Sequence, residues 1–283
     1  MNATPTPPNY RTQAADTAIE VDIFEFALLR KKSNRDRALL TATLTRGARQ
    51  LCLCGLKHTH RNLSQNSFAQ LVARAFLGDD NPPTFLPGGD TMTWIQDSLG
   101  LAAQLHELFE THQIPYYITD GVASTTYGEP RTTRNLDVVI SLQTVPLDLL
   151  VSELEKAGFY VPGVEDVRAR RMRILGITHT TTIARADLIM ADDTELDRVK
   201  FSRCQAIDIP NRNILYFASP EDVILNKLRW GQASQSEKQW RDVLGILKVQ
   251  TTQLDLDYLN HWANRLELTP ILLQAFNEAG LTL

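Results

Sequence analysis

Two aspartates lie within short apolar segments of the sequence. Asp137 follows Leu136 and precedes the run 138–140, and Asp187 lies within the segment 185–190, RADLIM. Burying an unpaired carboxylate is costly, which disfavours a purely structural role for Asp137, whereas Asp187 alone also fits a solubilising charge on an edge strand. Mg²⁺ or Mn²⁺ beside a phosphate chain is held by one or two carboxylates and by phosphate oxygens. Two carboxylates on adjacent strands therefore predict a metal site that polarises an attacking hydroxyl and neutralises a transferring phosphate.

A turn that contains Asp120 and Gly121 precedes the first of these segments. The β-prone run 116–119 leads into it, and a helix is predicted to start directly after it. The first backbone N–H groups of a helix have no partner within the helix and lie at its positive end, where they form a cradle for phosphates. We therefore expect a nucleoside triphosphate to be held by the backbone of Gly121, Val122, Ala123 and Ser124.

The elements that position these residues follow from the spacing of apolar side chains. Short β-prone runs predict strands at 116–119, 136–140, 172–177, 181–190, 204–209 and 213–217. Helical spacing predicts helices at 91–111, 147–157, 220–231, 236–249, 255–265 and 269–280. The pattern is typical of an α/β (α+β) protein.

Composition divides the chain into four parts. Residues 1–18 are rich in Pro, Thr and Asn and predict a disordered tail. Helical spacing and a terminal stretch rich in Gly and Pro predict a helical N-terminal domain at 19–89. A core at 90–218 and a helical C-terminal domain at 219–283 complete the prediction.

Charge and composition restrict where the protein acts. The formal net charge of −4 supplies no global positive field for nucleic acid or an anionic membrane. The three cysteines show no metal-ligand spacing, and the sequence shows neither a signal peptide nor a membrane-length apolar run. We expect a cytoplasmic protein without a membrane partner.

One local basic cluster leaves two interpretations open. It either grips RNA phosphates or forms a solvated rim that pairs with neighbouring carboxylates. Its members are Arg168, Arg170, Arg171 and Arg173.

The segment 114–140, with Asp187, resembles the nucleotidyltransferase superfamily of DNA polymerase β type. The resemblance covers about 90–250 and is closer to toxin nucleotidyltransferases of the AbiEii type and their uncharacterised bacterial relatives. The matching residues are Gly121, the run 127–132 (YGEPRT) with Arg131 and Thr132, Asp137 and Asp187. The resemblance implies a mixed sheet flanked by helices, with helical N-terminal and C-terminal regions. It also implies transfer of a nucleoside monophosphate from an NTP to a hydroxyl.

The C-terminal part of the chain resembles the same family. The run 220–228 and the sequence Arg241-Asp242-Val243 are similar to its Lys-Leu and Arg-Asp helix motifs. The resemblance implies that Lys227 contacts the nucleotide phosphates and that Asp242 orients the site. It further suggests tRNA or another RNA as the acceptor, and a cognate antitoxin-like protein as a partner.

Two positions depart from the family pattern. Asp120 stands where the family has the first glycine of its turn, and Asn135 stands where it has the first metal-binding aspartate. An amide is a poorer Mg²⁺ ligand than a carboxylate, so two-metal catalysis is weakened unless Asp120 supplies the missing charge. A pseudoenzyme that binds a nucleotide or a partner, a rearranged metal site and a deliberately inactivated protein all fit this pattern.

Overall fold

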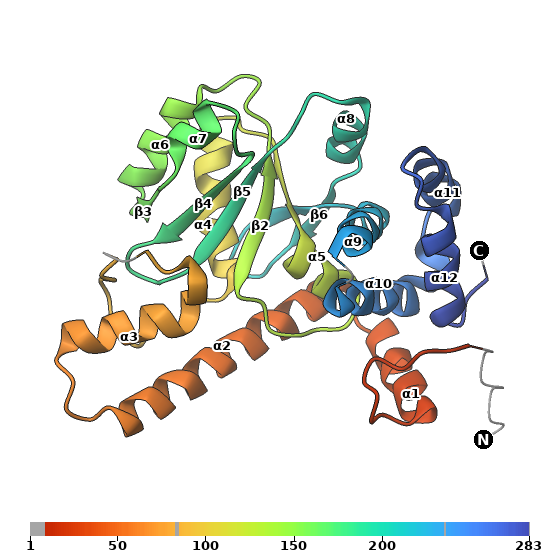
Figure 1. Ribbon diagram of the computed structural model, residues 1–283, viewed down its shortest axis with the longest axis horizontal. Coiled ribbons are helices and arrows are strands. Elements are labelled where there is room, and N and C mark those ends of the chain that lie inside the picture. Colours follow the sequence, from red (N-terminus) through yellow and green to blue (C-terminus); the bar gives the residue numbers. More distant parts are fainter. Residues whose placement is uncertain (1–8, 83–84, 235, 283) are drawn as a thin grey trace.

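The described residues form one seven-stranded mixed sheet flanked by helices (Figure 1). The computed structural model describes residues 9–82, 85–234 and 236–282. The strands follow the order β3-β4-β5-β2-β1-β7-β6. Their bounds are β1 Tyr116–Thr119, β2 Asn135–Ile140, β3 Phe159–Tyr160, β4 Ile174–His179, β5 Arg185–Met190, β6 Gln205–Asp208 and β7 Ile214–Phe217. The α/β class and six of the strands were predicted, and only the short edge strand β3 was not.

The pairing of the central strands explains why the sheet is mixed. β2 runs antiparallel to β1, to which a short helix and a loop connect it, and parallel to β5. β1 is in turn parallel to β7. These central strands consist largely of buried apolar residues, as strands covered on both faces do.

Helices cover the sheet and extend beyond it on both sides of the view in Figure 1. In the first half of the chain they are α1 Ile19–Arg30, α2 Asn34–Thr59, α3 Gln65–Leu77, α4 Ser98–Thr111, α5 Asp120–Tyr127 and α6 Leu147–Lys156. The second half contains α7 Val164–Arg168, α8 Glu195–Ser202, α9 Pro220–Ser234, α10 Glu237–Gln250, α11 Leu256–Arg265 and α12 Thr269–Glu278. Across the described part of the chain, no helix combines the length and apolar character needed to cross a bilayer.

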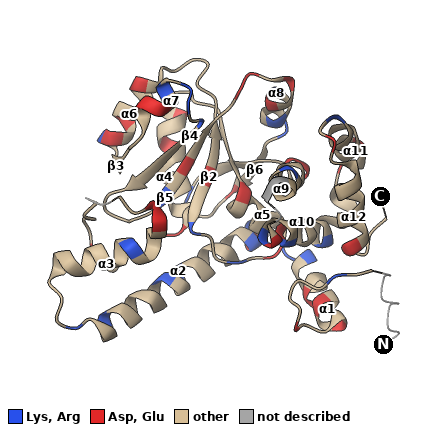
Figure 2. Ribbon diagram, viewed as in Figure 1, with Lys and Arg blue, Asp and Glu red and all other residues tan. Residues whose placement is uncertain are grey.

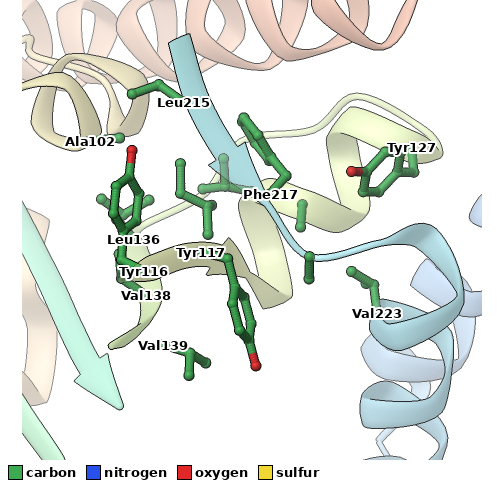
Figure 3. Close-up of a cluster of buried hydrophobic side chains, with 14 of the residues drawn as sticks. Ala102, Tyr116, Tyr117, Tyr127, Leu136, Val138, Val139, Leu215, Phe217 and Val223 are labelled. Atoms are coloured by element: carbon green, nitrogen blue, oxygen red, sulfur yellow. The ribbon is translucent and has the colours of Figure 1, made fainter. Parts of the chain in front are cut away.

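The main hydrophobic core lies where β1, β2 and β7 meet α5 and α9 (Figure 3). Tyr117, Tyr127 and Phe217 are almost completely buried there. Aromatic side chains of this size remove a large apolar area from water, so they fix the position of α5 against the sheet. The short helix α5, at whose N-terminus the phosphate cradle is predicted, is therefore held rigidly.

The N-terminal helix α2 packs directly on this core. Ala38 and Ala42 of α2 belong to the same buried cluster as the sheet. The buried Arg37 donates from Nε to the Thr126 carbonyl of α5 at 2.9 Å. The Thr133 backbone N–H donates to Thr45 Oγ1 at 3.3 Å. The segment predicted as a helical domain thus contributes a long helix, α2, that crosses beneath α5 and the start of β2 (Figure 1).

Two expectations change in the structure. Residues 1–8 of the predicted disordered tail lie outside the described residues, but the Arg11 N–H donates to the Glu278 carbonyl and Tyr10 donates to Asp22. Residues 9–18 are therefore held against α1 and α12. The helix predicted at 91–111 begins at Ser98, because the buried Asp97 accepts a hydrogen bond from the Gly100 N–H and so caps it.

A glycine at the end of α5 lets two helices approach closely. A Cβ at Gly128 would lie 2.8 Å from the Ile246 backbone nitrogen of α10. Since the contact is with backbone, Gly128→Ala is expected to lower the free energy of unfolding by about 2 kcal/mol in urea titrations. Gly47→Ala is the matched control. A Cβ at this position of α2 would have no neighbouring atom within 4 Å, so Gly47→Ala should raise the free energy of unfolding by up to about 1 kcal/mol. Equal effects of the two substitutions would contradict the close approach.

Candidate active site

The two aspartates predicted to share a cation lie at the same level of the sheet. β2 and β5 are parallel neighbours in which Asp137 pairs with Asp187 and Asn135 with Arg185. Since side chains alternate along a strand, the side chains of Asn135 and Asp137 lie on one face. The Asn135 Nδ2 donates to Asp137 Oδ1 at 3.1 Å and to Asp187 Oδ2 at 2.8 Å. One amide nitrogen thus bridges the two carboxylates.

A guanidinium holds the other oxygen of Asp187. The Arg185 Nη2 donates to Asp187 Oδ1 at 2.8 Å and lies 3.3 Å from Asp80 Oδ1. Gly176 of β4 is the register partner of Asp187, and a Cβ there would lie 2.9 Å from the Arg185 Nη2. The absence of a side chain at Gly176 leaves room for this ion pair. Asp187 is therefore oriented from two sides by groups of the protein itself.

The carboxyl of Asp137 has an unusual proton affinity. Burial raises its pKa to about 7, with further contributions from the charges of Asp120 and Asp187, whereas Lys227 and Lys238 oppose the shift. A carboxylate that is partly desolvated among like charges gains stability from a proton or from a cation. The site thus favours positive charge at Asp137.

The raised pKa predicts how stability depends on pH. Between about pH 4 and pH 7 the unfolded chain releases the proton of Asp137 while the folded chain retains it. The free energy of unfolding therefore falls as pH rises through this window, and the loss is complete above it. Asp137→Asn removes this loss. At pH 8 the free energy of unfolding of the variant should therefore be higher than that of the wild type by on the order of 2 kcal/mol.

Urea titrations from pH 4 to pH 8 in a chelating buffer test this prediction. The advantage of Asp137→Asn should shrink toward pH 4, where both chains are neutral at this position. Asp192→Asn, which removes an exposed carboxylate paired with Arg173 after β5, should show no such pH-dependent gain. A constant difference between Asp137→Asn and the wild type across this range would contradict the assignment.

A chain of ion pairs extends from the carboxylates toward α10. The Arg131 Nε and Nη2 donate to both oxygens of Asp242 at 3.0 and 2.7 Å. Lys227 Nζ lies 2.8 Å from Asp242 Oδ2 and 2.5 Å from Asp120 Oδ1, and it donates to Gln239 Oε1 at 2.6 Å. Burial would raise the pKa of Asp242, but the hydrogen bond from Arg131 and the charge of Lys227 outweigh it and lower the pKa. The predicted residues Arg131, Lys227 and Asp242 thus form one network.

A large cavity opens beside this network between the sheet and the N-terminal helices. Its volume is about 990 Å³. Figure 2 shows basic and acidic residues gathered where α2, α5 and α10 approach one another. The predicted residues that line the cavity are Asp120, Gly121, Arg131, Thr132, Asn135, Asp137 and Asp242. The predicted residues Val122, Ala123 and Ser124 are buried in α5 and, like Asp187 and Lys227, are not among the lining residues.

Several lining residues were not predicted from the sequence. α2 and α3 form one wall through Thr45, Ala48, Arg49, Cys52, Ala75, Phe76 and Leu77, and the remaining unpredicted contributors include Asp80, Arg134, Arg185, Lys238 and Gln239. Arg134 and Lys238 are exposed, and within the described chain neither forms a salt bridge. Arg134 adjoins Asn135 and Lys238 lies one helical turn before Asp242, so the sequence could have indicated both residues as part of the site. The sequence could not indicate the residues of α2, because they are distant in the chain from the predicted site residues and meet them only in the tertiary structure.

The side chains of Asp137, Asp187 and Asn135 fit one hard divalent cation whose remaining ligands come from a bound phosphate compound. Among the described residues, no group of three or more His, Cys, Asp and Glu side chains gathers into a preformed metal site. Asp137 and Asp187 supply two carboxylates, and a half-turn of the Asn135 amide would present its oxygen in place of the nitrogen. Mg²⁺ is commonly held by one or two carboxylates and by substrate phosphates.

The basic cluster at 168–173 makes ion pairs in the structure. Arg168 pairs with Glu165 and Asp148, Arg171 with Asp166, and Arg173 with Asp192. Figure 2 shows acidic and basic residues interspersed over α6 and α7. Paired cations attract phosphates less than free ones do, so the geometry matches the interpretation as a solvated rim for Arg168, Arg171 and Arg173. No ion pair involves the exposed Arg170 within the described chain.

Comparison with solved structures shows a structural similarity to a known protein. The chain is similar to the crystal structure of an antigenic nucleotidyltransferase-like protein from Paracoccidioides brasiliensis. The sequence identity is 19%, the TM-score is 0.42, and the match covers 65% of this chain and 94% of that chain. No protein-family model and no curated protein matches the sequence. At this identity and TM-score the similarity assigns neither an activity nor a ligand to this chain.

Proposed function

We propose that the large cavity binds a nucleoside triphosphate with Mg²⁺ or Mn²⁺ and transfers its nucleoside monophosphate to a hydroxyl. The observation that carries the proposal is the convergence of Asp137 and Asp187 on one amide nitrogen, next to the start of α5. Two carboxylates fixed on neighbouring strands beside a helix N-terminus suit a cation and a phosphate chain. A cavity of about 990 Å³ has room for a nucleotide and for part of an acceptor.

In this reaction the acceptor oxygen forms a bond to the α-phosphorus while the bond to the departing pyrophosphate breaks. Asp187 accepts the proton of the acceptor hydroxyl, and Arg185 holds this carboxylate in place. The exposed cations Arg134 and Lys238 bind phosphate oxygens. A bound divalent cation would add positive charge at the phosphate and lower the pKa of the hydroxyl. Positioning and electrostatics account for most catalysis of this type.

For the acceptor we propose an RNA 3′ hydroxyl, such as that of tRNA, in the cytoplasm. The resemblance of the motif residues to toxin nucleotidyltransferases suggests this acceptor, together with an antitoxin-like protein partner. The exposed side chains of Arg134 and Lys238, which form no salt bridge with any described residue, support an acceptor that carries phosphates.

A second candidate function is nucleotide binding without turnover. The observation that favours it is the Asn135 amide, whose nitrogen donates to both carboxylates and so satisfies them without a cation. A protein of this kind would act as a nucleotide sensor or as a scaffold for a partner.

Two measurements on one preparation separate the candidates. Calorimetric titration with ATP, CTP, GTP and UTP in the presence of Mg²⁺ or Mn²⁺ measures binding. Incubation with each labelled NTP and total tRNA, with and without free NTP as alternative acceptor, measures transfer. Binding with transfer supports the enzyme, binding without transfer supports the sensor, and absence of both rejects the two.

A further inference from the structure

Lys227 has no free position for a ligand. Its side chain is only 3% exposed, and its ammonium contacts Asp120 Oδ1, Asp242 Oδ2 and Gln239 Oε1. An ammonium group has three protons to donate, so these three oxygens use its whole capacity. Any phosphate that reaches Lys227 must first displace one of them.

All three partners line the large cavity, but Asp120 is the carboxylate that can be displaced. Its side chain is 42% exposed, against 6% for Asp242. Asp242 is also fixed by its two hydrogen bonds from Arg131. Asp120 lines the large cavity, whereas Lys227 lines a separate cavity of about 340 Å³ between α9, α10 and α12. Lys227 thus reaches the large cavity only through its three partners, of which Asp120 is the exposed carboxylate.

The position of Asp120 in the backbone places a negative charge where an anion would bind. Its φ is +46°, a conformation that glycine adopts without strain, and it is the first residue of α5. The carboxylate therefore lies between the positive end of this helix and a buried ammonium. The N-terminus of α5 and the ammonium of Lys227 both attract anions, and the carboxylate of Asp120 occupies the position between them.

We propose that Asp120 is a tethered anion that occupies the phosphate position of the site and limits which ligands enter. Its carboxylate neutralises Lys227, so a metal-free polyphosphate gains no attraction from this ammonium group. A nucleotide accompanied by its own cation is less affected, because the cation offsets the repulsion from Asp120 and Asp137. The inference rests on the proposed function and specifies its ligand as a metal–nucleotide complex rather than a free polyanion.

The test is calorimetric titration with inorganic tripolyphosphate in a buffer with EDTA. Asp120→Asn is expected to bind the probe about tenfold more tightly than the wild type, or better, because the competing charge is gone. Asp120→Gly should give the same gain, and its fold is secure because glycine suits the positive φ. Lys227→Met in the Asp120→Asn background should remove the gain.

Asp80→Asn is the matched control, because it removes one negative charge from the same cavity without touching Lys227. A gain in this control equal to that of Asp120→Asn would overturn the proposal and leave only a general charge effect. No gain in either Asp120 variant would overturn it too, while Mg·ATP binding to the wild type would keep the proposed function. If no variant binds tripolyphosphate and the wild type does not bind Mg·ATP, both proposals fall.

Discussion

Replacing Asp187 by alanine is expected to reduce nucleotidyl transfer by about a thousandfold. The substitution removes one of two carboxylates that share the Asn135 amide, and with it the proposed acceptor of the hydroxyl proton. Because the interaction is proposed to strengthen as the hydroxyl loses its proton, the loss should appear in kcat more than in KM for the NTP. Initial rates with labelled NTP and the acceptor found by screening measure it.

The controls separate a lost catalytic group from a damaged fold. Asp187→Asn keeps the shape of the side chain and should lose as much activity as Asp187→Ala. Asp192→Ala breaks an ion pair with Arg173 just beyond β5 and should keep most of the activity. Thermal unfolding of all three variants shows whether the sheet is intact. Retention of more than about a tenth of the activity by folded Asp187→Ala would contradict the assigned role.

Replacing Asn135 by aspartate is expected to raise Mn²⁺ affinity at least about tenfold and turnover by about a hundredfold. The amide nitrogen now donates to Asp137 and Asp187, which lowers their need for a cation. A carboxylate at 135 would instead bring a third negative charge to this point and provide a stronger ligand. Calorimetric titration with Mn²⁺ and the transfer assay measure the two effects.

Stability gives an independent test of the same change. In EDTA the three carboxylates of Asn135→Asp should repel one another and lower the melting temperature, and Mn²⁺ should restore it. Asn264→Asp, an exposed position on α11, should show neither effect. A variant with unchanged metal affinity and unchanged melting behaviour would show that position 135 lies outside the cation site.

The prediction of secondary structure from sequence succeeded where the pattern is local. The segments 116–119 and 136–140 carry β-prone, apolar residues and appear as β1 and β2. The prediction of one long helix at 91–111 was wrong in its first turns, because Asp97 ends the turn before it and caps a shorter helix. Asp97 is held there by Arg46 and Arg212, and contacts at such separation leave no periodic signal.

Parts of the candidate site were equally accessible from the sequence. Asn135 and Asp137 are two residues apart on a strand, so their common face follows from the alternation of side chains. The turn at Asp120 and Gly121 is local as well, and it appears at the start of α5. The roles proposed for these residues remain predictions until the assays above are done.

The sequence by itself determined the class of the protein, the strands that carry Asp137 and Asp187, and the turn before α5. The tertiary structure decided that Asp187 lies level with Asp137, that Lys227 pairs with Asp120, and that α2 and α3 wall the cavity. The physical reason is the range of the forces involved. Apolar periodicity and turn chemistry act between neighbours in the chain, whereas strand order and ion pairing depend on which distant surfaces pack together.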